Sequence, residues 1–198
     1  MRKQAGFSLI ELIVTLTVAA ILVSIAIPNF KTTIDNNRQI SELNTLLTGM
    51  VYARSEAVKR NVDVVICSTS DQATCSGSWS NGWLVYYTPS GTYNAPGTTN
   101  PTNPLPAPTS AEIIRRYPAL GGGNTLKSDL NAVNNTIVFQ SSGLTLLSND
   151  SQFTLCDARG SQYARVLMVS VTGRAEVLPW SSSSGPTWGS KTLTVSCP

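Results

Sequence analysis

An apolar run near the N-terminus limits what this chain can fold into. Residues 7–27 contain one ionisable side chain, Glu11, and two basic residues, Arg2 and Lys3, precede the run. A helix of these 21 residues spans about 30 Å, the thickness of the bilayer hydrocarbon. The basic flank should stay cytoplasmic, with the following chain outside the cytoplasm. The sequence therefore predicts a membrane helix followed by an exported domain.

A secretory signal peptide is the alternative interpretation, and residues 18–20 (VAA) offer a small-residue cleavage site. Two features count against it. A carboxylate inside the apolar region costs about 2.5–3.5 kcal/mol on insertion scales, and the helical pattern continues beyond Ala20. An ionisable residue in such a segment is a functional-site hypothesis, and it needs a partner.

The segment GFSLIEL, residues 6–12, resembles the prepilin cleavage and methylation motif of type IV pilins and type II secretion pseudopilins. The resemblance covers the junction, the glutamate and the following helix with its proline, Pro28. It implies that a prepilin peptidase cuts after Gly6 and methylates Phe7, which becomes the first residue. Residues 1–6 would then be a cleaved leader.

The charges created by this cleavage fit the implied role in assembly. The new amine of Phe7 would lie four residues from Glu11, both in an apolar setting, where a buried charge is tolerated only when paired. In a staggered stack of helices, Glu11 of one subunit can meet the amine of its neighbour. The resemblance implies other pilin or pseudopilin subunits, an inner-membrane assembly platform and, before assembly, membrane lipid as partners. It places the chain in the bacterial inner membrane with a periplasmic head, and at the cell surface after assembly.

Beyond the apolar run the pattern becomes amphipathic. We expect one long helix over about 8–59, its second half packed on the following domain, although a helix–loop–helix broken at Pro28 and Asn29 is an alternative. Residues 7–29 would form the transmembrane and assembly helix, and 30–198 the globular domain with the amphipathic half. The residues expected on the buried face are Phe30, Ile34, Leu43, Leu46, Leu47, Met50, Val51, Ala57 and Val58.

The remainder changes to the short apolar runs and turn clusters typical of strands. A helix followed by many strands predicts an α+β fold, an antiparallel sheet wrapped on the amphipathic helix. Residues 89–110, rich in proline, are expected to form a long loop that is either a surface excursion or the part that distinguishes this subunit. The predicted strands are 62–67, 82–87, 113–117, 136–139, 152–156, 164–171, 175–178 and 192–197.

Four further segments resemble the GspH/FimT/FimU group of minor pilins and pseudopilins, whose members are thought to form or prime filament tips. They are ARSEA (53–57), NGWLV (81–85), CDARG (156–160) and VSVTGR (169–174). Residues of three of these segments also have a structural interpretation. Arg54 and Glu56 can simply be solvated, and Trp83 is expected in the core or half-buried in the sheet. Gly173 should be the turn of a hairpin with Arg174 at its tip.

Arg174 is a candidate DNA contact, because some FimT-type pilins that capture DNA resemble this hairpin but carry glycine–arginine–x–arginine. Here Glu176 replaces the second arginine, and it would repel phosphate. Without Arg2 and Lys3, 12 basic residues face 11 acidic ones, a net charge of +1. Nucleic acid is therefore not an expected partner.

The four cysteines have no CxxC spacing, which argues against a zinc ribbon or a thioredoxin-type site. Behind a membrane-targeting segment they indicate two disulfides. Three pairings are possible, and we favour Cys67–Cys75 and Cys156–Cys197. The chain has no histidine, and we find no metal-ligand cluster, nucleotide-binding loop or carboxylate pair, so neither an enzyme nor a cofactor is expected. The sequence favours a type IV minor pilin, with a type II secretion pseudopilin as the alternative and a DNA-uptake receptor third.

Overall fold

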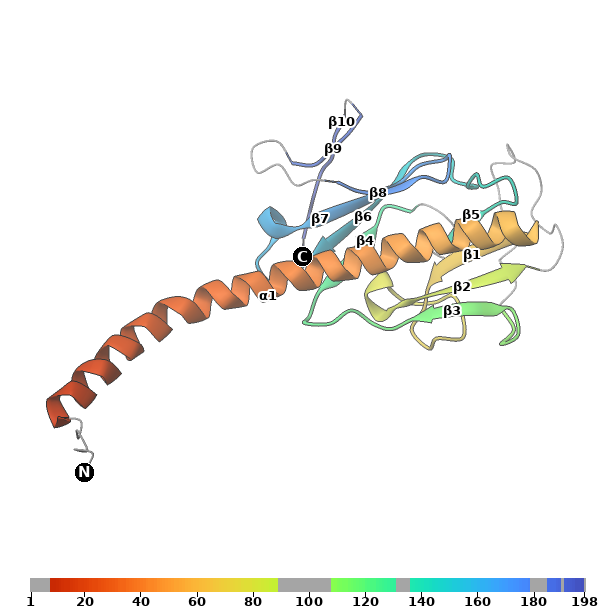
Figure 1. Ribbon diagram of the computed structural model, residues 1–198. Coiled ribbons are helices and arrows are strands. Elements are labelled where there is room, and N and C mark those ends of the chain that lie inside the picture. The colour runs from red at the N-terminus through yellow and green to blue at the C-terminus, as the bar shows by residue number, and fades with distance from the viewer. Residues whose placement is uncertain (1–7, 89–107, 131–135, 179–184, 190, 198) are drawn as a thin grey trace. The chain divides into compact units, whose positions relative to one another are not determined.

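The structure is a computed structural model, which describes residues 8–88, 108–130, 136–178, 185–189 and 191–197 (Figure 1). Gly6, Phe7 and most of the 89–110 loop lie outside the described residues. The chain divides into two compact units, Met1–Arg38 and Gln39–Pro198.

A single helix, α1 (Leu9–Arg60), contains 52 residues and confirms the predicted long helix. It continues through Pro28, so the helix–loop–helix alternative is wrong. Proline removes one amide donor and weakens the helix locally, but helical hydrogen bonding continues in the residues on both sides. The helix ends before Asn61, whose φ of 54° is the left-handed conformation that commonly terminates helices.

The second half of α1 buries one stripe of side chains, spaced alternately three and four residues apart. These are Leu43, Leu46, Met50, Ala53 and Ala57, each at most 1% exposed. Val51 and Val58 were expected on this face, but they are 56% and 54% exposed. Each follows a stripe residue directly, and successive side chains of a helix point about 100° apart around its axis. Val51 and Val58 therefore point away from the buried face. Phe30 and Ile34, in the other unit, are exposed as well.

Two antiparallel four-stranded sheets follow, which confirms the α+β class although one sheet was expected (Figure 1). The first sheet has the order β3-β2-β1-β5, and the second the order β4-β6-β7-β8. Their strands are β1 (Asp63–Ser68), β2 (Trp83–Thr88), β3 (Ile113–Tyr117), β4 (Thr125–Ser128), β5 (Thr136–Phe139), β6 (Ser151–Cys156), β7 (Arg165–Val169) and β8 (Ala175–Leu178).

Two differences from the predicted strands matter. Strand β4 was missed, because its four residues include only one large apolar side chain, Leu126. The strand predicted over 192–197 is wrong for 193–197, which are not in a strand. Only β10 (Lys191–Thr192) is extended there, and it pairs with β9 (Thr187–Trp188).

The second half of α1 and the inner faces of both sheets form one core. The helix stripe packs with residues such as Val64 and Ile137 of the first sheet and Phe153 and Leu167 of the second. Trp83 is 1% exposed and stacks on Tyr117, with ring centroids 5.3 Å apart. These observations confirm Trp83 as a core residue.

The outer face of each sheet is also apolar, and a segment tied down by a disulfide packs on each. Cys75, bonded to Cys67, packs against an outer cluster of the first sheet that includes Leu84 and Tyr86. Cys197, bonded to Cys156, ends the segment that packs on the second sheet. The pairing is the one that the sequence favoured. Cys197, however, fixes an irregular segment and not a strand.

Candidate assembly site

The apolar half of α1 is exposed on every side. Its large apolar side chains from Leu9 to Ile27 are between 48% and 76% exposed. A soluble monomer rarely leaves so large an apolar surface in water. Among the described residues, α1 is the one helix long and apolar enough to cross a membrane, with a mean hydropathy of 2.6 over its most apolar window. This half of the helix therefore requires lipid or other protein around it.

The hydroxyl groups within this apolar run are satisfied inside the helix. Thr15, Thr17 and Ser24 each donate to the carbonyl three residues earlier, over 2.7–2.9 Å. Such bonds allow a hydroxyl to lie in a medium without water. Glu11 is the one ionisable side chain in the same run.

Glu11 lies in the first turn of α1 and is exposed. A carboxylate is favoured there by the helix dipole, but this contribution is small beside the cost of placing a charge in hydrocarbon. Within the part of the chain that the structure describes, Glu11 forms no ion pair. The proposed counter-ion on Phe7, like Gly6, lies outside that part.

The hairpin between β7 and β8 contains the second predicted site residue, Arg174. Gly173 forms the turn with a φ of 77°, and its amide donates to the Ser170 carbonyl over 2.9 Å. A guanidinium nitrogen of Arg174 lies 2.6 Å from a carboxylate oxygen of Glu176, and both side chains are well exposed. The hairpin is the one predicted, and its exposed cation is already paired with an acid.

Arg54 and Glu56 are not simply solvated, as the sequence suggested. Arg54 Nε donates to the carbonyl oxygen of Gly143 over 2.9 Å. Glu56 is 7% exposed, and its carboxylate accepts a 2.6 Å hydrogen bond from Arg60. This bond, together with the charges of Lys59 and Arg60, lowers the pKa of Glu56 even though burial opposes the shift. Arg54 therefore links the end of α1 to the loop after β5, whereas Glu56 pairs with cations of its own helix.

The CDARG segment forms a local charged turn. Arg159 donates to both oxygens of Asp157, from its backbone amide over 2.9 Å and from Nε over 2.8 Å. The guanidinium also lies over the Tyr163 ring, 4.3 Å from its centroid. Burial raises the pKa of Asp157, but the hydrogen bonds and charge of Arg159 outweigh it and lower the pKa overall. The segment is a self-contained turn beside Cys156.

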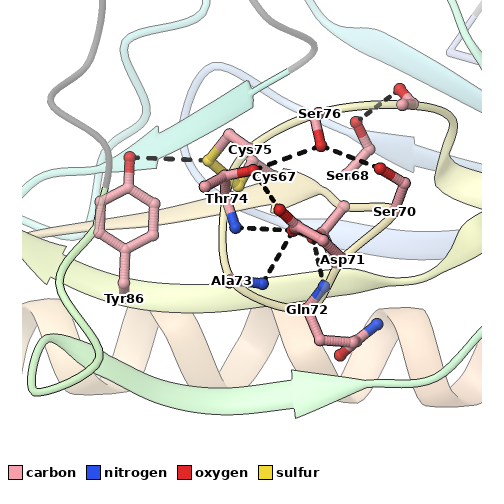
Figure 2. Close-up of a disulfide and its surroundings, with 12 residues drawn as sticks. Cys67, Ser68, Ser70, Asp71, Gln72, Ala73, Thr74, Cys75, Ser76 and Tyr86 are labelled. Atoms are coloured by element: carbon pink, nitrogen blue, oxygen red, sulfur yellow. Dashed lines mark hydrogen bonds between the residues drawn. A yellow bond between two sulfur atoms is a disulfide. The ribbon is translucent and has the colours of Figure 1, made fainter.

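Sequence reasoning missed the role of Asp71 in the loop closed by Cys67–Cys75 (Figure 2). Its Oδ1 accepts bonds from the amides of Ala73 and Thr74 and from the Thr69 hydroxyl, and Oδ2 accepts from the Thr74 hydroxyl. The Thr74 amide, the Ala73 amide and the Thr74 hydroxyl lower the pKa of Asp71 strongly. An aspartate in a short polar loop, here between Ser70 and Gln72, is the local signal for such a turn. The described residues contain no group of three or more His, Cys, Asp or Glu that could hold a metal ion.

Comparisons with known proteins agree with these features. The family model described as "Type II transport protein GspH" matches residues 42–173, and that of the "Prokaryotic N-terminal methylation motif" matches residues 1–27. A search of curated proteins found no match.

Two solved structures of a minor pilin are similar in fold, and a third comparison gives a lower score. The type IV minor pilin FimU of Pseudomonas aeruginosa is 21% identical, with a TM-score of 0.55 over 79% of this chain and 98% of FimU. A second crystal form of FimU is 20% identical, with a TM-score of 0.52 over 76% of this chain and 98% of that one. The minor pseudopilin EpsH of Vibrio cholerae is 9% identical, with a TM-score of 0.44 over 71% of this chain and 96% of EpsH. The chain belongs to the GspH family, within the GspH/FimT/FimU group of minor pilins and pseudopilins.

Proposed function

We propose that this chain is a minor pilin of a type IV pilus that helps to form or prime the filament tip. Its prepilin form would be cut after Gly6, and Phe7 would be methylated. The observation that carries the proposal is the exposed apolar run with its lone acid, Glu11, in a chain whose residues 1–27 match the methylation motif.

The proposed assembly step is the pairing of charges between subunits. In the membrane, each separate subunit carries the cost of an unpaired Glu11 carboxylate. Once the leader is removed, the Phe7 amine of a neighbouring subunit supplies the counter-ion, and the pair is enclosed by apolar side chains. Pairing relieves the cost that each charge has alone, which favours the filament over the dispersed subunits.

We further propose a single-pass topology, with residues 7–29 in the inner membrane and 30–198 in the periplasm before assembly. The two disulfides support it, because such bonds form in oxidising compartments. Processing by a prepilin peptidase and extraction by an inner-membrane platform belong to the same proposal. Neither the proposed role nor the site requires a catalytic residue or a cofactor.

A type II secretion pseudopilin is the second candidate, and the name of the matching family favours it. The likeness to FimU and the presence of two disulfides favour the pilus. Deletion of the gene separates the two functions. Loss of surface pili with normal secretion of exoproteins is expected, whereas normal piliation with loss of secretion would assign the chain to a pseudopilus.

The role of Glu11 is tested by substitution in the full chain. Glu11→Val and the isosteric Glu11→Gln should insert into the membrane at normal levels but enter filaments poorly. Thr17→Val is the matched control, because the Thr17 hydroxyl bonds only within its own helix, to the Val14 carbonyl. Immunoblots of membrane and sheared filament fractions give the two quantities. Normal incorporation of both Glu11 variants would refute the role.

A further inference from the structure

The C-terminal segment packs on the outer face of the second sheet. We call its described residues, 185–189 and 191–197, the C-terminal strap. Leu193 of the strap forms an apolar cluster with Val166, Met168 and Leu178, and Trp188 and Val195 pack against it. These three sheet residues are at most 6% exposed. The strap lies beyond residue 173, where the match to the family model ends.

Few polar contacts hold the strap on the sheet. Trp188 Nε1 donates to Asp150 over 2.7 Å, and the side-chain Nε2 of Gln152 donates to the Thr194 carbonyl over 3.0 Å. The backbone amide of Cys197 donates to the Ser161 hydroxyl over 3.1 Å. No strap residue pairs with a strand of the second sheet, whose order is β4-β6-β7-β8. The ladder of this sheet and the core cluster on its inner face therefore include no described strap residue. Such a segment can open as a local unit while the domain stays folded.

The covalent tie is the Cys156–Cys197 disulfide, which joins residues 41 positions apart. Cys156 is 1% exposed, whereas Cys197 is half-buried, so a reductant reaches the sulfur of Cys197 more easily. A dithiol would attack there as a thiolate, form a mixed disulfide with Cys197 and release the Cys156 thiolate. Its second thiol would then displace Cys197 and leave the reductant as a cyclic disulfide, while both cysteines take up protons.

We infer that the strap is a redox-sensitive cover, and that the Cys156–Cys197 disulfide decides whether the apolar face of Val166, Met168 and Leu178 is closed. In the oxidised chain the tether keeps the strap at high local concentration over this face. In the reduced chain the strap opens locally, and the face becomes accessible to solvent while the rest of the head stays folded. The Cys67–Cys75 disulfide closes a separate loop and should not affect the strap.

Hydrogen exchange on the purified full chain in detergent micelles tests this inference. In Cys156→Ser/Cys197→Ser, peptides covering 191–197 should exchange faster than in the unsubstituted chain, by roughly 30-fold to 1,000-fold, as expected for the loss of a typical disulfide constraint. The exchange rates of peptides covering β6 and β7 should change less than about twofold. The matched control, Cys67→Ser/Cys75→Ser, should leave the exchange of 191–197 unchanged.

A second measurement avoids any failure of the double variant to fold. The control variant, which keeps only Cys156–Cys197, is folded and then reduced with dithiothreitol while exchange is followed. Faster exchange confined to the strap supports the inference. Unchanged exchange after reduction shows that packing alone holds the strap, and faster exchange throughout β6 and β7 shows that the disulfide stabilises the whole sheet. Either result would overturn the proposed cover.

Discussion

Arg54 near the end of α1 donates a 2.9 Å hydrogen bond to the carbonyl of Gly143, a residue 89 positions away in the chain. The same carbonyl lies against Gly173, where a Cβ atom would overlap its oxygen. One carbonyl thus joins the helix, the loop after β5 and the β7–β8 hairpin. Position 54 should therefore be more sensitive to substitution than its exposure suggests, and the buried position 173 should tolerate an added Cβ poorly.

Arg54→Met tests the hydrogen bond while keeping most of the apolar stem. We expect a loss of about 1–2 kcal/mol in the free energy of unfolding, because the Gly143 carbonyl loses a charged donor. Arg174→Met is the control, since the exposed Arg174–Glu176 pair should contribute less than about 1 kcal/mol. Urea unfolding of the full chain in detergent, followed by the fluorescence of the buried tryptophans, measures both. Equal losses for the two variants would contradict a special role for Arg54.

Gly173→Ala combines two costs. Alanine is strained at a φ of 77°, and its Cβ would collide with the Gly143 carbonyl. Gly123→Ala is the matched control, because Gly123 has a φ of 74° but has no atom within 4 Å of the added Cβ. We expect about 1 kcal/mol of destabilisation at Gly123 and clearly more than about 2 kcal/mol at Gly173. Similar values would show that the contact with Gly143 relaxes easily.

Asp71 should make stability depend on pH at the acid end. Its pKa in the folded chain is lowered by the hydrogen bonds of the Thr74 amide, the Ala73 amide and the Thr74 hydroxyl. A lowered carboxyl pKa contributes stability above the unfolded value of about 3.9, and this is lost as the pH falls toward the folded value. Asp71→Asn should therefore be less stable than the unsubstituted chain at pH 5–7. Urea midpoints at pH 7, 5 and 3 should show the difference shrinking at the lowest pH, and a constant difference would contradict this origin.

DNA binding should be weak in the unsubstituted chain, because Glu176 pairs with Arg174 and repels phosphate. We expect no salt-dependent binding of duplex DNA at low micromolar concentrations. Glu176→Arg should create such binding, and Arg174→Ala added to it should weaken the binding again. Fluorescence anisotropy at two salt concentrations measures these changes. Micromolar, salt-sensitive binding by the unsubstituted chain that is lost in Arg174→Ala would overturn this expectation.

The parts of the fold that depend on local pattern were predictable. The long helix follows from uninterrupted helical periodicity, and the strand–turn–strand pattern around Gly173 predicted the hairpin. The lone acid in an apolar run points to Glu11 as the assembly residue, and this role stays a prediction. The favoured disulfide pairing also agrees with the structure.

Features that depend on distant contacts were not predictable. Arg54 looked solvated because its partner, the Gly143 carbonyl, is far away in sequence. Val51 and Val58 looked buried because the sequence alone does not show which of two adjacent apolar residues belongs to the buried stripe of a helix. The segment 193–197 alternates like a strand, but it packs across a sheet by its side chains and joins no ladder.

The central claim, that removal of the leader provides the counter-ion of Glu11, is tested most directly by the mass of the native N-terminal peptide. Mass spectrometry of the chain isolated from its own membranes should show that it begins at Phe7 and carries one methyl group on the amine. An intact N-terminus beginning at Met1, or trimming near Ala20, would contradict the account.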